Sequence, residues 1–106
     1  MDLVEKVYEA SRALPAEERF GLASQMQRAA VSVPSNIAEG HSRKATGAFL
    51  NHLSIAAGSL AELETQVHVA KRLGYIGADV ESSLLGAADE IGRMLSGLRS
   101  SLDSRC

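Results

Sequence analysis

The sequence has no tryptophan, only four other aromatic residues and a single cysteine, Cys106, among its 106 residues. One cysteine excludes an internal disulfide framework and a cysteine-ligated zinc cluster. Few aromatic residues disfavour a β-sheet, which is built largely on aromatic and β-branched side chains. No apolar run approaches the roughly 18 residues of a membrane span, and the start lacks the basic and apolar regions of a signal peptide. We therefore expect a cytoplasmic protein with no membrane partner.

The residues that are present suit helices. Hydrophobic residues make up 45% of the chain and charged residues 23%, and the length is that of one domain with a single core. The net charge is −2. A dedicated DNA-binding domain is usually basic. Any nucleic-acid role must therefore depend on a local patch, or on patches summed over an oligomer.

Apolar residues recur every three or four positions in four segments, which predicts four helices. The predicted helices cover about residues 2–13, 15–39, 46–72 and 78–102. The first is short, so it is either a stub or part of a longer helix that the numbered chain lacks. Short connections make neighbouring helices antiparallel. The sequence predicts an all-α fold, an antiparallel up-down-up-down four-helix bundle, as one domain over residues 1–106.

Local signals set the expected bounds of the second helix. Pro15 suits the first turn of a helix, and Glu17 and Glu18 complement its positive end. Pro34 falls inside the apolar pattern without changing its phase, which favours a kinked but continuous helix over a break. Gly40 is the predicted C-terminal cap.

The third helix has the clearest pattern. Ser42 or Thr46 is expected to cap its start and Gly74 its end. Gly58, in a run of small residues, predicts the close approach of another backbone. A heptad seam of apolar residues predicts bundle packing; it consists of Phe49, Leu53, Ala56, Leu60, Leu63, Val67 and Ala70. A second face also carries apolar residues, which predicts self-association.

Signals for catalysis are weak. The sequence has no G-x-S-x-G motif and no glycine-rich phosphate loop after a strand, so we expect no enzyme activity and no cofactor. Ferritin-like metal sites need a Glu-x-x-His motif from each of two helices. Glu64 and His68 are four residues apart and occur once. A metal or small-ligand site at Glu62, Glu64 and His68 is the least favoured hypothesis, and surface histidines are the simpler interpretation.

Polar residues cluster on one side of each of the two central helices. Ser32, Ser35, Asn36 and Glu39 share a side of the second helix, and Ser59, Glu62 and Gln66 share a face of the third. Such faces can satisfy each other by hydrogen bonds. This pattern favours a buried network that fixes helix register over a binding pocket. Its expected members are Ser32, Asn36, Glu39, Ser59, Glu62 and Gln66.

Basic residues form a second candidate site, for nucleic acid. The candidates are Arg28, Arg43, Lys44, Lys71 and Arg72. Arg43 and Lys44 follow the second helix and the other pair ends the third, so an up-down bundle separates them into two small spots. Solvated helix-end charges are the favoured interpretation for a monomer. Repetition around a ring would favour phosphate binding, which grows with the number of neutralised phosphates.

Two stretches carry a resemblance to a known family. QMQRAAVSVPSNIAEGHSR (residues 25–43) and FLNHLSIAAGSLAELETQVHVAKRLGYI (residues 49–76) resemble the "four helix bundle protein" family. Its members include proteins encoded by intervening sequences in bacterial 23S rRNA genes and the accessory variability protein of diversity-generating retroelements. The matching positions are Arg28, Ser32, Pro34, Asn36, Glu39, Gly40, Arg43, Ser59, Glu62 and Glu64.

The resemblance implies an antiparallel four-helix bundle that assembles into a ring-like homopentamer without enzyme activity. The retroelement branch implies binding to RNA or DNA and to a reverse transcriptase through basic residues. This chain departs from the family in its short first helix without tryptophan, and from that branch in its acidic balance. Two functions are therefore compared: an oligomer that binds nucleic acid, and a protein-interaction or assembly module without nucleic-acid affinity.

Overall fold

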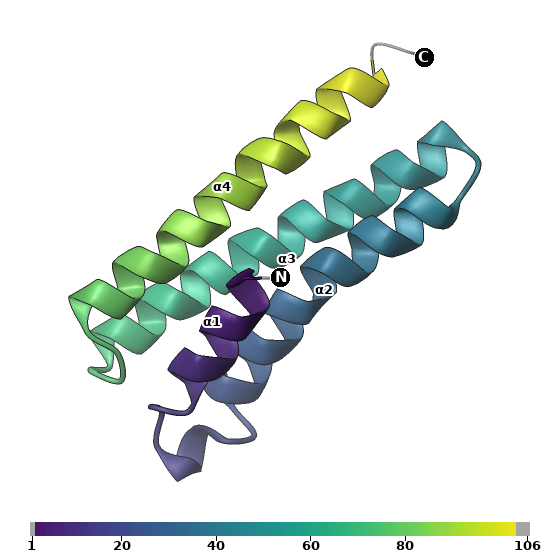
Figure 1. Ribbon diagram of the computed structural model, residues 1–106. Helices are drawn as coiled ribbons and strands as arrows, with labels where there is room; N and C mark the ends of the chain where they lie inside the picture. The colour runs from purple at the N-terminus through teal and green to yellow at the C-terminus, as the bar shows by residue number, and fades with distance from the viewer. Residues whose placement is uncertain (1, 104–106) are drawn as a thin grey trace.

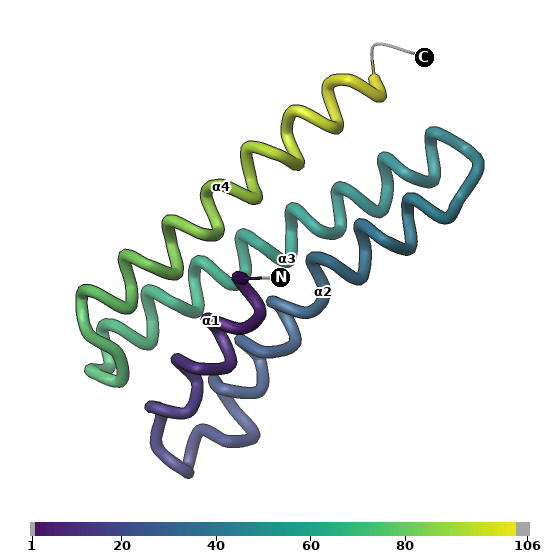
Figure 2. The backbone as a smooth tube through the Cα atoms, in the orientation of Figure 1, coloured from purple at the N-terminus to yellow at the C-terminus, as the bar shows by residue number. Residues whose placement is uncertain are grey.

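Residues 2–103 fold into four α-helices and one short 3₁₀ helix (Figure 1). The computed structural model describes residues 2–103, so Cys106 lies outside the described residues. The elements in chain order are α1 (Asp2–Ser11), η1 (Ala16–Glu18), α2 (Leu22–Ser42), α3 (Thr46–Arg72) and α4 (Ala78–Asp103). Successive helices run in opposite directions, which gives the predicted all-α bundle (Figure 2). None of the described helices is long and apolar enough to cross a membrane.

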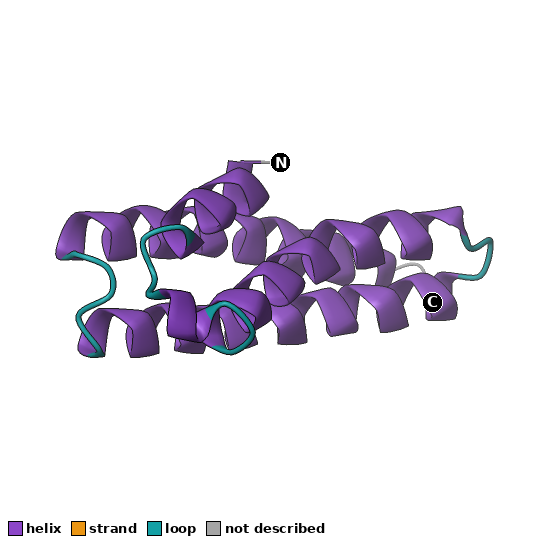
Figure 3. Cartoon of the chain, turned by 90° about the horizontal axis from the view of Figure 1, so that it is seen from below, coloured by secondary structure: helices purple, strands orange, loops and turns teal. Residues whose placement is uncertain are grey.

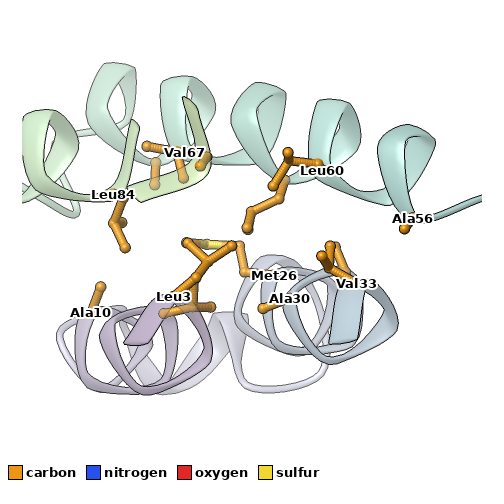
Figure 4. Packing of buried hydrophobic residues seen from close by; sticks show 14 of the residues in the cluster. Leu3, Ala10, Met26, Ala30, Val33, Ala56, Leu60, Val67 and Leu84 are labelled. Carbon is orange, nitrogen blue, oxygen red and sulfur yellow. The ribbon is translucent and has the colours of Figure 1, made fainter. Parts of the chain in front are cut away.

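One seam of α3 forms the centre of the core. Leu53, Ala56, Leu63 and Ala70 are completely buried. The other helices pack Leu3, Met26 and Leu84 and similar residues against this seam (Figure 4). Full burial of one such side chain stabilises the fold by roughly 1.5–3 kcal/mol. The heptad seam is therefore confirmed from Leu53 onward, while Phe49 at its start is half-buried.

The molecule measures 46 × 23 × 18 Å, and its two halves differ. The short α1 lies beside α2 and α4 over one half of the bundle only (Figures 1 and 3). In the other half α2, α3 and α4 pack without it. Leu95 stays buried in α4, but Leu98 is 37% exposed and Met94 68%.

The predicted start of the second helix is wrong. Pro15 precedes the short helix η1, and α2 begins at Leu22. The Leu22 N–H donates to the Glu18 carboxylate at 3.2 Å, so Glu18 satisfies a free donor at the start of α2 instead of lying inside it. A Cβ on Gly21 would lie 2.8 Å from Glu18 Oε1. The residue before α2 must therefore be small for this contact to form.

The predicted end of the second helix is also wrong. α2 continues through Pro34, which confirms its continuity, and reaches Ser42. Gly40 is buried within the helix, where an added Cβ would lie 2.7 Å from the Cβ of His52 and 2.9 Å from Phe49 Cδ1. Gly40 therefore allows α2 and α3 to approach closely and is not a cap.

Two expectations about α3 fail and one holds. Its N-cap is Ala45, without a side-chain hydrogen bond, so neither Ser42 nor Thr46 caps it. A Cβ on Gly58 would meet nothing within 4 Å, so this glycine faces open space instead of another backbone. Gly74 is confirmed as the C-terminal cap, because its φ is 77° and the next N–H, of Tyr75, donates to the Ala70 carbonyl at 2.9 Å.

Candidate functional site

A chain of hydrogen bonds joins α2 to α3 along one side of the bundle. The hydroxyls of Ser32 and Ser59 lie 2.8 Å apart. Asn36 Nδ2 donates to the Ser32 carbonyl at 2.8 Å and to its hydroxyl at 3.0 Å. On the other side of the amide, Asn36 Oδ1 lies 3.1 Å from His52 Nδ1. Because Oδ1 can only accept, His52 donates from Nδ1.

Three of the six expected network residues are thus brought together, and His52 was missed. A signal for His52 exists, since it precedes Ser59 by seven residues and so lies on the same face of α3. Glu39 instead forms an ion pair with Arg43 at 2.7 Å, with both side chains 52% exposed. Ser35 is exposed. Glu39 was misplaced because Arg43, four residues later at the end of α2, binds its carboxylate.

Glu62 and Gln66 lie further along α3. Gln66 is only 7% exposed, and its Nε2 donates to Glu62 Oε1 at 3.3 Å. Its Oε1 is buried and has no partner within residues 2–103. Both side chains line an open hollow of about 600 Å³ between α2 and α3, together with Arg28. Arg28 therefore lies within α2, beside this hollow, and not in a turn at the rim.

The turn between α2 and α3 and the end of α3 lie at opposite ends of the bundle (Figure 1), and the remaining basic candidates lie there. Arg43 and Lys44 lie at the turn between α2 and α3. Lys71 and Arg72 end α3 at the other end, where exposed Arg12 and Arg19 also lie between α1 and α2. In the described part of the chain, Lys44, Lys71 and Arg72 form no ion pair. Neither Arg12 nor Arg19 was predicted as part of a site, because they join this end only through the fold.

The least favoured hypothesis, a metal site, receives no support from these positions. His68 Nδ1 lies 3.2 Å from the Glu81 carboxylate of α4, and Glu62 accepts from Gln66. Among residues 2–103, no group of three or more His, Cys, Asp or Glu side chains is arranged to hold a metal ion.

Comparisons with known proteins agree with this architecture. The family model described as "23S rRNA-intervening sequence protein" matches residues 1–97. A crystal structure of a protein of unknown function from the S23 ribosomal protein family of Bacteroides thetaiotaomicron VPI-5482 is similar, with a TM-score of 0.77 and 25% sequence identity. The match covers 92% of this chain and 95% of that one. No curated protein sequence matches the chain.

Proposed function

The chain belongs to the 23S rRNA-intervening sequence protein family, and from this premise we propose that it is a non-enzymatic homo-oligomer that binds RNA or DNA through the cations at its rims. The observation that carries the proposal is the group of unpaired cations at both ends. Lys44, Lys71 and Arg72 have no acidic partner within residues 2–103, so their charge remains available to phosphates.

The absence of catalysis is part of the proposal and rests on the hydrogen-bond network. His52 contacts the amide oxygen of Asn36, and the two serine hydroxyls of the network contact each other or the amide nitrogen. A serine nucleophile needs a base within hydrogen-bond reach. The network instead has the form of a structural link between α2 and α3.

Self-association would allow a protein with a net charge of −2 to bind nucleic acid through its rim cations. A monomer offers few cations at each end, whereas a ring of copies would repeat each spot and neutralise more phosphates. Exposed apolar residues support such assembly, since Ile55 and Val69 of α3 and Leu73 directly after it are 44%, 41% and 55% exposed. A homopentamer, which the family resemblance implies, is the assembly that we propose.

Fluorescence anisotropy with labelled RNA and DNA oligonucleotides across a salt series tests this function. We expect affinity to fall steeply as salt rises, because bound phosphates release counterions. The double variant Lys71→Ala, Arg72→Ala should reduce the salt slope by about 1–2 per bound copy. Arg93→Ala is the matched control, because Arg93 lies within α4 and pairs with Asp89 at 2.6 Å. Absence of binding at low salt would rule out the proposal.

The second candidate is an assembly module that binds a protein, such as a reverse transcriptase, and has no nucleic-acid affinity of its own. The open hollow of about 600 Å³ between α2 and α3 favours it, because a side chain of a partner protein could enter this hollow. A protein partner that remains bound after nuclease treatment, together with no oligonucleotide binding, would favour this candidate over the first.

A further inference from the structure

Phe20 is the most exposed large hydrophobic residue among residues 2–103. Its side chain is 90% exposed, whereas the next, Met94, is 68% exposed. It lies in the short connection between η1 and α2. Single exposed apolar residues are common on protein surfaces, so the surroundings of the ring decide whether it has a use.

The connection that carries Phe20 is fixed on both sides. The Glu18 carboxylate accepts from the Leu22 N–H at 3.2 Å and from the Tyr75 hydroxyl at 3.0 Å. The Gly21 N–H donates to the Glu18 carbonyl at 3.1 Å. These bonds tie the turn to the start of α2 and to the loop between α3 and α4. The ring is therefore held out from a braced turn, and little ordering would be needed for it to bind.

A cation precedes the ring in the sequence, and Gly21 follows it. Arg19 Cζ lies 5.6 Å from the centroid of the Phe20 ring, as in a cation–π pair. The Tyr75 hydrogen bond joins this turn to the end of the bundle that carries Lys71 and Arg72. Glu17 and, in the first turn of α4, Asp79 are opposing acids at this end, while the Glu18 carboxylate accepts from two donors. This end of the bundle thus combines one exposed aromatic ring with several cations.

We propose that Phe20 is a stacking platform for a base of single-stranded nucleic acid, whose phosphates bind Arg19, Lys71 and Arg72. The inference rests on the proposed function and names its ligand class. Bases in a duplex are stacked on each other, whereas an unpaired base has a free face for an aromatic ring. The cation–π contact of the ring with Arg19, at the end that also carries Lys71 and Arg72, favours a ligand with both a π-face and negative charge over an apolar protein partner.

Anisotropy titrations with labelled oligo(U), oligo(dT) and a blunt duplex of equal length test the proposal. We expect both single strands to bind more tightly than the duplex. Phe20→Ala should weaken single-strand binding about 5- to 150-fold at fixed salt, which corresponds to the loss of one base–aromatic stack. Its salt slope should equal that of the wild type, because no phosphate contact is removed. Phe20→Tyr should retain the affinity, and the two oligonucleotides show whether RNA or DNA is preferred.

The control variants distinguish base stacking from nonspecific apolar binding. Phe20→Leu keeps an apolar side chain but no ring, so it should bind as weakly as Phe20→Ala. Met94→Ala removes another exposed apolar side chain, on α4, and should change nothing. Wild-type affinity for Phe20→Ala or Phe20→Leu, or equal binding to the duplex, would overturn the stacking proposal and leave rim binding intact. No binding by the wild type at low salt would overturn both.

Discussion

Gly40 shows how one missing side chain sets the distance between two helices. It is buried in α2 directly against the backbone-proximal atoms of α3. A Cβ there would lie 2.7 Å from the Cβ of His52, and a Cβ cannot swing away as the tip of a long side chain can. The same contact brings His52 beside α2, where it meets Asn36. The glycine therefore supports the hydrogen-bond network as well as the core.

We expect Gly40→Ala to destabilise the protein by about 1–3 kcal/mol, as overpacking does. Alanine has the better helix propensity by about 1 kcal/mol, so a net loss would show that the contact dominates. Gly58→Ala is the matched control. Its Cβ would meet nothing within 4 Å, so we expect a gain of up to about 1 kcal/mol. Urea unfolding of both variants measures these changes, and equal stability of the two would contradict the packing argument.

The candidate site was predictable where its residues follow helical spacing. Ser32 and Asn36 are one turn apart, and Ser59 lies on the polar face of α3, so these were identified from the sequence. Glu39 was predicted to meet α3, but its carboxylate pairs with Arg43. Which of the two partners it binds depends on side-chain geometry, which the spacing of residues along the sequence does not reveal. Phe20 had no periodic signal, since its importance comes from an exposure that only the fold determines.

At the scale of elements, η1 and the start of α2 depend on a contact between distant parts of the chain. Proline and two acids are local signals for a helix start, and they predicted a helix that begins near Pro15. Glu18 instead binds Tyr75, 57 residues away in sequence. Helix α3, in contrast, was predictable over its length because its heptad seam and its Gly74 cap are local features. Helix boundaries that depend on tertiary contacts cannot be predicted from the periodicity of apolar residues.

The bond between Tyr75 and Glu18 predicts a loss of stability at alkaline pH. The hydrogen bond to Glu18 raises the pKa of the Tyr75 phenol above 10.0, with further contributions from burial and from the charges of Glu18 and Glu17. A pKa raised in the folded state means that the phenol stabilises the fold fully below pH 10 and loses this contribution as pH rises through the folded value.

Unfolding free energies measured from pH 8 to above pH 10 test this. We expect Tyr75→Phe to be less stable than the wild type at pH 8, and the difference to shrink as the wild-type phenol ionises. Tyr8→Phe is the control, because the Tyr8 hydroxyl forms no side-chain hydrogen bond within residues 2–103. A difference in unfolding free energy between the wild type and Tyr75→Phe that stays constant with pH would contradict the stabilising role of the hydrogen bond between Tyr75 and Glu18.

At the scale of the whole molecule, the exposed apolar side chains within α3 and the rim cations occupy different surfaces, whereas Phe20 lies at a cationic end. The unpaired cations lie at the two ends, and the exposed Ile55 and Val69 lie on α3 between them. Copies that associate through the sides of the bundle would leave its ends free. Assembly and phosphate binding are therefore compatible, and under the proposed function the first strengthens the second.

This arrangement predicts that assembly and nucleic-acid affinity are lost together. We expect Val69→Glu to shift the protein from an oligomer to a monomer of 11.2 kDa in light scattering, because a carboxylate would be buried in the contact. Its helix content should not change, since Val69 is 41% exposed in the isolated bundle.

Met94→Glu, at an exposed position on α4, is the control and should remain oligomeric. The monomeric variant keeps every rim cation, yet its salt slope for nucleic acid should fall, because fewer cations act together on one strand. A monomeric wild type at micromolar concentration would contradict the proposed assembly. An unchanged slope in the monomeric variant would show that one copy contains the whole binding surface, and assembly would then not serve nucleic-acid binding.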